Sequence, residues 1–462
     1  MSDVMSNNTL KAGFSRLNIT PFLGSAILGY FEARNMKGVL DELEINAIAI
    51  GCEDTRAVLI SVDNPMMPDR IIADDIIRHI SEVTGLPSEA IFICVTHIHT
   101  GPMWGQGLLA PEWASDENKQ LGKEYNVFMR QRLTDAAVMA LNDMKSAHLG
   151  FAESLAPGIS FIRRYRMKDG SLHTNPGINN PDVDAPVGIP DERVHILRFL
   201  REDADDILLV NFGTHPDVIG GEYVSADWPG FTRRTIERVL PNVKCAFFNG
   251  IEGDVNHINI HPKQIPDSMK DNYAKSRYEH SEFMGQAIAG AVLEVFGNMQ
   301  YVDVDSVRFL RHEINVPANV PGPDTDMEKI RLIHRLHEEG HDDEIPFSGM
   351  EKVTVIAEAQ RILALEHGPE YFPMTISVIA IGKTALVGFP GEPFSRIGIL
   401  LKETKGWDAI LTCSNTTTAE AYFPTKDAYD EGGYEARSSY FKAGVGELML
   451  NEAVNMLNEL KQ

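Results

Sequence analysis

Basic residues are scarce in this chain of 462 residues. Its 42 lysines and arginines stand against 66 aspartates and glutamates, a formal net charge of −24 at pH 7. Because neutralising the phosphates of nucleic acid requires a basic surface, we expect no nucleic-acid partner. The charge also argues weakly against anionic membranes, and we expect no stable membrane association. A small-molecule substrate fits better, and a homo-oligomer is left open.

Cysteine is sparse as well. Cys52, Cys94, Cys245 and Cys413 lie far apart in apolar stretches and form no CxxC pair. This pattern predicts buried free thiols in a reducing compartment. The polar N-terminus lacks the apolar region of a signal peptide, and no apolar run reaches the ~18 residues that span a bilayer. We therefore expect a soluble, cytoplasmic protein.

Strand and helix patterns alternate along the chain. Arg56–Val62 and Ala90–Val95 are short apolar runs, and Asp69–Thr84 between them carries isoleucines at helical spacing. The same alternation recurs in two further sets: Ile207–Phe212, Pro229–Leu240 and Lys244–Phe248; then Ile376–Ile381, Ala385–Phe389, Ser395–Glu403 and Ala409–Cys413. The pattern predicts an α/β fold with a largely parallel or mixed sheet covered by helices, built as one catalytic domain over residues 1–462.

Two further segments are predicted to be helical. Residues 443–460 have the amphipathic pattern of a terminal helix. Residues 324–367 are highly charged and carry His334, His337 and His341 in fully hydrophilic surroundings. We interpret 324–367 as a helical insertion, either a solvated helix or a lid over the site, in preference to a metal site.

Polar motifs directly follow four of the predicted strands. In open α/β sheets, ligands bind at the carboxyl ends of the strands. The first motif is THIHTGP, with His97 and His99 in an H-x-H pattern. In an extended chain this pattern points both imidazoles to one side, where they can converge on one ion or substrate. One of the two could equally be a hydrogen-bonded core residue.

The second and third motifs add further candidate groups. NFGTHP places His215 just past an apolar strand, where a single capping histidine is the simpler interpretation. FNGIEGDVNH offers Asp254, Asn256 and His257 in a loop whose two glycines allow a close approach of the backbone to a ligand. A turn rich in side-chain hydrogen bonds is the alternative for this loop.

The fourth motif is FPGEP, which fixes Glu392 between two prolines. Such a carboxylate is poorly explained as a solvated surface charge, although it could favour the dipole of the next helix. Tyr422, Tyr429 and Tyr434 follow in a loop rich in glycine and aspartate, where tyrosines usually serve packing.

Taken together, the four motifs favour a divalent metal site. Imidazole and carboxylate ligands suit Zn²⁺ best, with iron or manganese as alternatives. Signatures of competing enzyme classes are missing from the chain, which has no GxSxG, no P-loop and no GxGxxG after a strand.

The motifs also resemble those of a known family. THIHTGP is similar to the THTHSGP motif of the neutral/alkaline (non-lysosomal) ceramidases. NFGTHP with SADWPG, NGIEGDVNH, FPGEP, and AYFPT with YDEGGYE match further motifs of that family in the same order. The resemblance runs from about Ala12 to the terminal helix and covers nearly the whole catalytic domain. The secretory signal and C-terminal immunoglobulin-like domain of ceramidases have no counterpart in this sequence.

The resemblance implies one zinc ion held by His97, His215, Glu392 and Tyr422. A second divalent ion is left open, because further possible ligands are present in Asp63, Asp227, Asp254 and His257.

The resemblance also implies residues that face the substrate. It places His99 beside the metal as a hydrogen-bonding group and matches Tyr434 to a second active-site tyrosine. Arg163 matches the family's active-site arginine, with Arg164 as the alternative because the flanking residues differ.

One position departs from the family pattern. The serine proposed as nucleophile lies in a GD-x-S motif, and here the corresponding residue is Asn256. Because asparagine cannot attack a carbonyl, ceramide hydrolysis through a serine is not expected. The sequence resembles the intracellular bacterial-type relatives of ceramidases more closely.

The favoured hypothesis is a zinc-dependent hydrolase of an amide, lactone or ester bond in a small polar metabolite. Water on a catalytic zinc has a pKa of roughly 7 and replaces the serine as nucleophile. His99 or Tyr434 would assist the oxyanion or the leaving group, Arg163 and Asp254 would bind substrate, and Asn256 and His257 would orient it. Two alternatives stay open: a metal-dependent isomerase, epimerase or lyase acting on a sugar acid or hydroxy acid, and a non-catalytic metal-bound binding protein.

Overall fold

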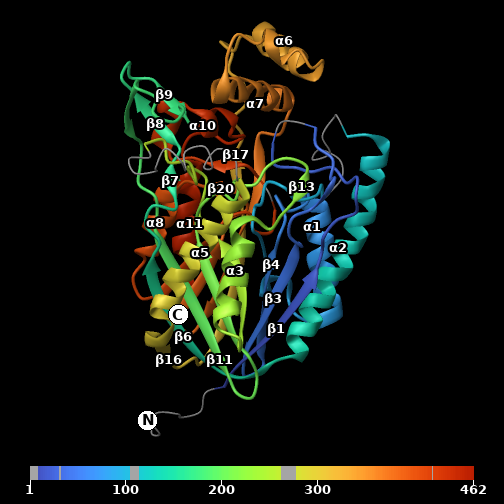
Figure 1. Ribbon diagram of the computed structural model, residues 1–462, viewed down its shortest axis with the longest axis vertical. Coiled ribbons are helices and arrows are strands. Elements are labelled where there is room, and N and C mark those ends of the chain that lie inside the picture. The colour runs from blue at the N-terminus through green and yellow to red at the C-terminus, as the bar shows by residue number, and fades with distance from the viewer. Residues whose placement is uncertain (1–8, 31–32, 105–113, 262–276, 419, 462) are drawn as a thin grey trace.

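A mixed nine-stranded sheet forms the largest part of the structure (Figure 1), a computed structural model that describes residues 9–30, 33–104, 114–261, 277–418 and 420–461. The strands lie in the order β14-β12-β11-β6-β1-β3-β4-β5, and β16 pairs with β6. Their bounds are β1 (Leu10–Asn18), β3 (Glu44–Cys52), β4 (Thr55–Val62), β5 (Ile91–Val95), β6 (Lys145–Leu155), β11 (Arg193–Arg201), β12 (Asp206–Phe212), β14 (Val243–Asn249) and β16 (Gln300–Val302). Only the β4–β5 and β12–β14 pairs are parallel, so the predicted α/β fold with a mixed sheet is confirmed.

The nine-stranded sheet divides between β1 and β6, which pair over only two residues of each strand. The two halves then pack face to face: Ser61 on β4 donates a hydrogen bond to the carbonyl of Phe247 on β14, and the rings of Phe92 and Phe248 lie 6.5 Å apart. Alternate residues of the β12 strand point to opposite faces. Leu209 joins the core between the halves, whereas its neighbour Leu208 packs into the cluster formed with α3 and α5.

Helices cover both outer faces of this sandwich (Figure 1). On one side lie α1 (Arg70–Thr84) and α2 (Asp116–Asn142), and on the other lie α3 (Asp227–Val239) and α5 (Arg277–Val295). The α1 helix begins as the sequence predicts, because the Asp69 side chain accepts a hydrogen bond from the backbone of Ile72, and it ends at Gly85 with a φ of 73°. The result is a four-layer arrangement of helices, two half-sheets and helices.

A second sheet extends this core. It has the order β17-β18-β19-β21, with bounds β17 (Val307–Pro317), β18 (Tyr371–Ile381), β19 (Thr384–Gly388) and β21 (Ala409–Cys413). Ile379 and Leu386 face the core of the large sheet, whereas Ile376 and Val387 pack against α8 (Ser395–Lys402) and α11 (Val445–Glu459). The predicted terminal helix is thus confirmed as α11.

The predicted insertion contains two helices at the top of Figure 1, α6 (Met327–Glu338) and α7 (Gly349–Glu366). They share a small core of their own, in which Val355 and Ile362 of α7 are buried. The expectation of a solvated helix is therefore wrong for α7. The many charged residues of the segment 324–367 made its buried face hard to recognise from the sequence. His337 pairs with Asp342 at 2.9 Å and His341 is exposed. A lid function stays a prediction.

The remaining elements are short. They are β2 (Gly38–Val39), β7 (Phe161–Ile162), β8 (Arg164–Met167), β9 (Leu172–Thr174), β10 (Val183–Pro186), β13 (Tyr223–Val224), β15 (Val255–Asn256), β20 (Glu392–Pro393), β22 (Tyr422–Phe423), α9 (Lys426–Glu431), α10 (Tyr434–Ser438) and the 3₁₀ turns η1 (Ser88–Ala90), η3 (Phe296–Asn298) and η4 (Asp342–Glu344). All four cysteines are buried and free, as expected. Within the described ranges, no helix is both long enough and apolar enough to cross a bilayer.

Candidate metal centre

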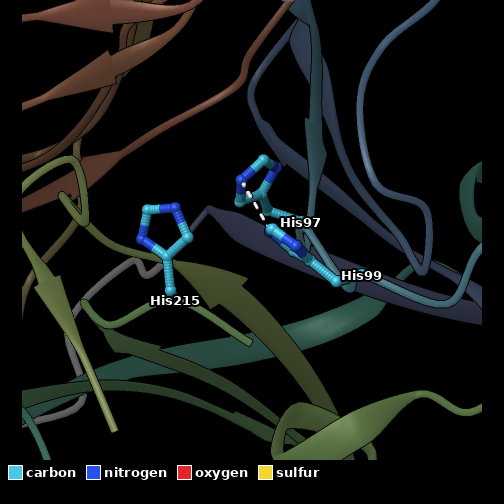
Figure 2. Close-up of side chains that lie close together, drawn as sticks. All are labelled: His97, His99 and His215. Carbon is cyan, nitrogen blue, oxygen red and sulfur yellow. Dashed lines mark hydrogen bonds between the residues drawn. The ribbon is translucent and has the colours of Figure 1, made fainter. Parts of the chain in front are cut away.

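Three histidines from two separate segments converge in one place. One ring nitrogen from each lies within 4.8 Å of the other two, and in the described part of the chain this is the one group of three or more metal-ligating side chains so close together. Figure 2 shows the rings of His97, His99 and His215 facing a common point. The Nε2 atoms of His97 and His99 are 3.4 Å apart.

The H-x-H motif reaches this arrangement by a turn. The expected extended conformation is wrong, because His97 has a φ of 65° in the left-handed region, which non-glycine residues seldom adopt. The backbone N–H of His97 donates to Asn64 at 3.0 Å, and that of His99 donates to Pro216 at 3.1 Å. The second bond ties the H-x-H loop directly to the segment that carries His215.

Backbone carbonyls fix the orientation of two of the rings. The Nδ1 atom of His97 lies 2.5 Å from the carbonyl oxygen of Pro65, and Nδ1 of His215 lies 2.8 Å from that of Glu252 and 3.1 Å from that of Val255. Since a carbonyl can only accept, each Nδ1 carries a proton, and in the neutral ring each Nε2 presents a lone pair to the centre. Metal-binding histidines characteristically have their second nitrogen held in this way.

Glu392 completes the inner group. Its Oε1 lies 3.5 Å from Nε2 of His97, and its Oε2 lies 3.1 Å from Nε2 of His215. Burial alone would raise the pKa of Glu392, but the neighbouring histidines and Arg163 lower it below its usual value. The side chain is therefore a buried carboxylate rather than a neutral acid.

A close backbone contact positions Glu392. A β-carbon on Gly253 would lie 2.4 Å from the carbonyl oxygen of Glu392, and the Gly253 N–H donates to Pro393 at 2.9 Å. Only glycine lets the two loops approach so closely. The glycine of the third motif thus brings two parts of the site together.

Two tyrosines border the histidines. The Tyr422 ring stacks on His215 at a centroid distance of 6.5 Å, and Tyr434 meets Tyr422 edge-on at 5.5 Å. Burial raises the pKa of both phenols well above the usual value, and the charge of Glu392 adds to the effect. In the protein alone, both are neutral hydrogen-bond donors at pH 7.

Of the two candidate arginines, the structure brings Arg163 to the centre. Its Nη1 lies 3.4 Å from Nε2 of His215, its Nε donates to Glu435 at 2.6 Å, and its Nη2 donates to the carbonyl of Gly253 at 2.8 Å. Arg164 instead donates to the side chain of Glu431 and to a nearby carbonyl.

The donor set fits a zinc ion. Oε2 of Glu392 is buried and accepts no hydrogen bond from the described residues, although the Nε2 lone pair of a neutral His215 faces it. Two such lone pairs repel each other unless a cation lies between them, and imidazole with carboxylate is a ligand combination that zinc binds. His97, His215 and Glu392 would hold the ion, with Tyr422 and His99 beside them.

The remaining predicted residues lie further out. Both carboxylate oxygens of Asp254 accept hydrogen bonds from Ser395 at the start of α8. Asn256 donates to Oδ1 of Asn175 at 3.1 Å, and its own Oδ1 accepts from the backbone of Ile258. These contacts position loops, and substrate-binding roles for Asp254 and Asn256 stay predictions.

Two acidic residues that lie at the site were not predicted from the sequence. Asp217 lies 2.9 Å from Nδ1 of His257, whose charge helps to lower the Asp217 pKa despite burial. Glu252 is fully buried, where burial and the nearby Glu392 raise its pKa. A signal was present in both cases, since Asp217 follows His215 by two residues and Glu252 lies within the third motif.

The fold is that of the neutral ceramidases. The structure is similar to the crystal structure of neutral ceramidase from Pseudomonas aeruginosa, with a TM-score of 0.73 and 15% identity over 98% of this chain and 75% of that one. It is also similar to a ceramidase solved in complex with C2, with a TM-score of 0.72 and 14% identity over 98% of this chain and 76% of that one. No family model and no curated protein sequence matches. At this identity the likeness establishes the fold, which the motif resemblance predicted, and function must be argued from the site.

Proposed function

We propose that this chain is a zinc-dependent hydrolase that cleaves an amide, lactone or ester bond in a small polar metabolite. The observation that carries the proposal is the convergence of His97, His215 and Glu392, which direct donor atoms to one point from three separate segments. When bound there, a zinc ion polarises a carbonyl and lowers the pKa of water to about 7, which supplies a nucleophile at neutral pH.

The residues around this point match the needs of carbonyl hydrolysis. Tyr434 is half-buried, and its raised pKa keeps it a phenol that can donate a hydrogen bond to a developing oxyanion. Arg163 is held by Glu435 and the Gly253 carbonyl, so its position is fixed before substrate binds. His99 borders the same space, with its ring against Tyr30.

Water is the expected nucleophile because the protein supplies none at the family's serine position. Asn256 stands there, and its amide and carbonyl groups are both engaged in hydrogen bonds. The solved relatives are described as ceramidases. We propose a smaller and more polar substrate than ceramide for this chain, since it lacks the serine that would attack the amide carbonyl of ceramide.

Metal content and hydrolysis test the proposal together. Purified protein is expected to bind about one zinc per chain, measured by mass spectrometry after dialysis, and to hydrolyse at least one member of an amide, ester and lactone panel. His97→Ala and Glu392→Ala should lose both properties, because each removes an inner ligand. His341→Ala on the exposed side of η4 is the matched control and should keep both.

Two results would contradict the proposal. One is wild-type protein without bound zinc after reconstitution, and the other is unchanged zinc content in both ligand variants. Exchange of solvent deuterium into a sugar acid or hydroxy acid without hydrolysis would favour the isomerase alternative instead.

A further inference from the structure

We propose that a cavity beside the metal centre binds a carboxylate group of the substrate. The inference rests on the proposed function and narrows its substrate to a carboxylate-bearing amide, lactone or ester. The cavity has a volume of about 300 Å³, which is within the range of small-molecule sites. Its polar lining consists of Arg277, His257, His280 and Asn175, and its apolar lining includes Val218, Ile258 and Ile260.

The described lining of this cavity holds an arginine and no acidic residue. No aspartate or glutamate is among the described residues that line it, although acidic residues outnumber basic ones by 66 to 42 in the sequence. Arg277 lines it, and within the described ranges this arginine has no ion pair or hydrogen bond. A guanidinium is planar and can form two parallel hydrogen bonds with a carboxylate in a bidentate arrangement.

Contacts on the cavity wall connect it to the metal centre. Val218 follows His215 by three residues, and Asp217 between them holds Nδ1 of His257 at 2.9 Å. On the other side, the backbone N–H of Asn175 donates to the carbonyl of Arg163 at 2.7 Å. The segments that position His215 and Arg163 therefore also form the cavity.

The same contacts decide which polar atoms remain for a ligand. With Nδ1 of His257 on Asp217, Nε2 is the ring nitrogen left to face a ligand. Oδ1 of Asn175 accepts from Asn256, which leaves the Asn175 amide nitrogen as a donor. Together with Arg277, these groups suit a carboxylate, and the apolar residues suit a short aliphatic segment attached to it.

The proposal is tested by comparing the binding affinities of hexanoate and hexanamide, a measurement that does not require catalytic activity. Isothermal titration is carried out on zinc-loaded protein and on protein stripped with EDTA. Wild-type protein should prefer hexanoate by about tenfold in both states, the effect of one charged hydrogen bond. Arg277→Met removes the guanidinium and Asn175→Asp adds a negative charge, so both should abolish most of the preference. Arg78→Met, at an exposed arginine of α1, should retain it.

Three results would overturn the inference: no preference in wild-type protein, a preference that survives in both cavity variants, or a preference that disappears with the metal. The last result would place the carboxylate on the zinc. Failure of the proposed function gives a different outcome, because a chain that binds no zinc and hydrolyses nothing would still show the hexanoate preference in the stripped state.

Discussion

Glu392 and Tyr422 are direct partners in the short parallel ladder of β20 and β22, although thirty residues separate them in the chain. Opposed residues of neighbouring strands direct their side chains to the same face, and here that face carries His215. The ladder therefore explains how a carboxylate and a phenol from two different motifs reach the same metal centre.

Tyr422→Phe is expected to weaken zinc binding without unfolding the ladder, because it removes one hydroxyl and keeps the ring against His215. We expect a loss of about tenfold in zinc affinity, the lower end of the effect of losing a residue that supports a metal site. A competition titration with a fluorescent zinc chelator measures it. Tyr371→Phe, at an exposed tyrosine of β18, is the control and should bind zinc as the wild type does. Equal affinities for both variants would remove Tyr422 from the centre.

Zinc itself should stabilise the folded chain. A ligand that binds only the native state adds about 2.7 kcal/mol at a free concentration one hundred times its Kd, so the melting temperature should rise on addition of zinc. His215→Ala removes the Nε2 donor and should abolish the rise, whereas His341→Ala should preserve it. Differential scanning fluorimetry at matched protein concentration provides the measurement. A zinc-dependent rise in His215→Ala would place the ion elsewhere.

Glu435→Gln should destabilise the protein. Glu435 is fully buried between Arg163, at 2.6 Å, and Arg164, at 3.8 Å, so the substitution leaves two buried guanidinium groups without their shared anion. Removing one partner of a buried pair costs about 3 kcal/mol, measurable as a lower urea midpoint. Glu431→Gln changes a more exposed partner of Arg164 and should cost about 1 kcal/mol or less. Similar midpoints for the two variants would contradict this assignment.

Local patterns predicted much of the framework. The apolar run that forms β5 and the helix capped by Asp69 fall within a residue of their predicted ends, because burial and capping are readable from neighbouring residues. The long antiparallel strands β6 and β11 and the division of the sheet were not predicted, since strand pairing depends on residues far apart in the chain. The α2 helix was missed because its buried residues, such as Tyr125 and Leu133, are spread among many lysines, glutamines and acids.

The candidate site shows the same limit. Strand-end motifs pointed to His97, His215 and Glu392, which the structure brings together. The left-handed backbone of His97 was not predictable, because contacts with Asn64 and Pro65 from another loop impose it. Asp217 is held by His257, which lies forty residues away, and by the Tyr30 hydroxyl, which donates to its carbonyl.

A half-buried ion cluster formed by Asp191, Arg193 and Lys402 gives a prediction for pH. Asp191 lies 2.7 Å from Nε of Arg193 and 3.0 Å from Nζ of Lys402. Burial alone would raise the Asp191 pKa, but the two cations lower it well below its usual range, and burial lowers the pKa of Lys402. A carboxylate whose pKa is lowered on folding contributes stability that is present above its unfolded pKa of about 4 and is lost as the pH falls below that value.

Asp191→Asn should therefore reduce the free energy of unfolding by about 2 kcal/mol at pH 7, since Lys402 loses its half-buried anionic partner. Because the unfolded wild type takes up a proton at Asp191 near pH 4 while the folded carboxylate stays ionised, the difference between wild type and variant should narrow between pH 5 and pH 3. Urea unfolding at pH 7, 5, 4 and 3 measures both quantities. Asp303→Asn, at an exposed aspartate, should match the wild type throughout. A difference for Asp191→Asn that stays constant with pH would show that the lost stability comes from packing and not from the charge.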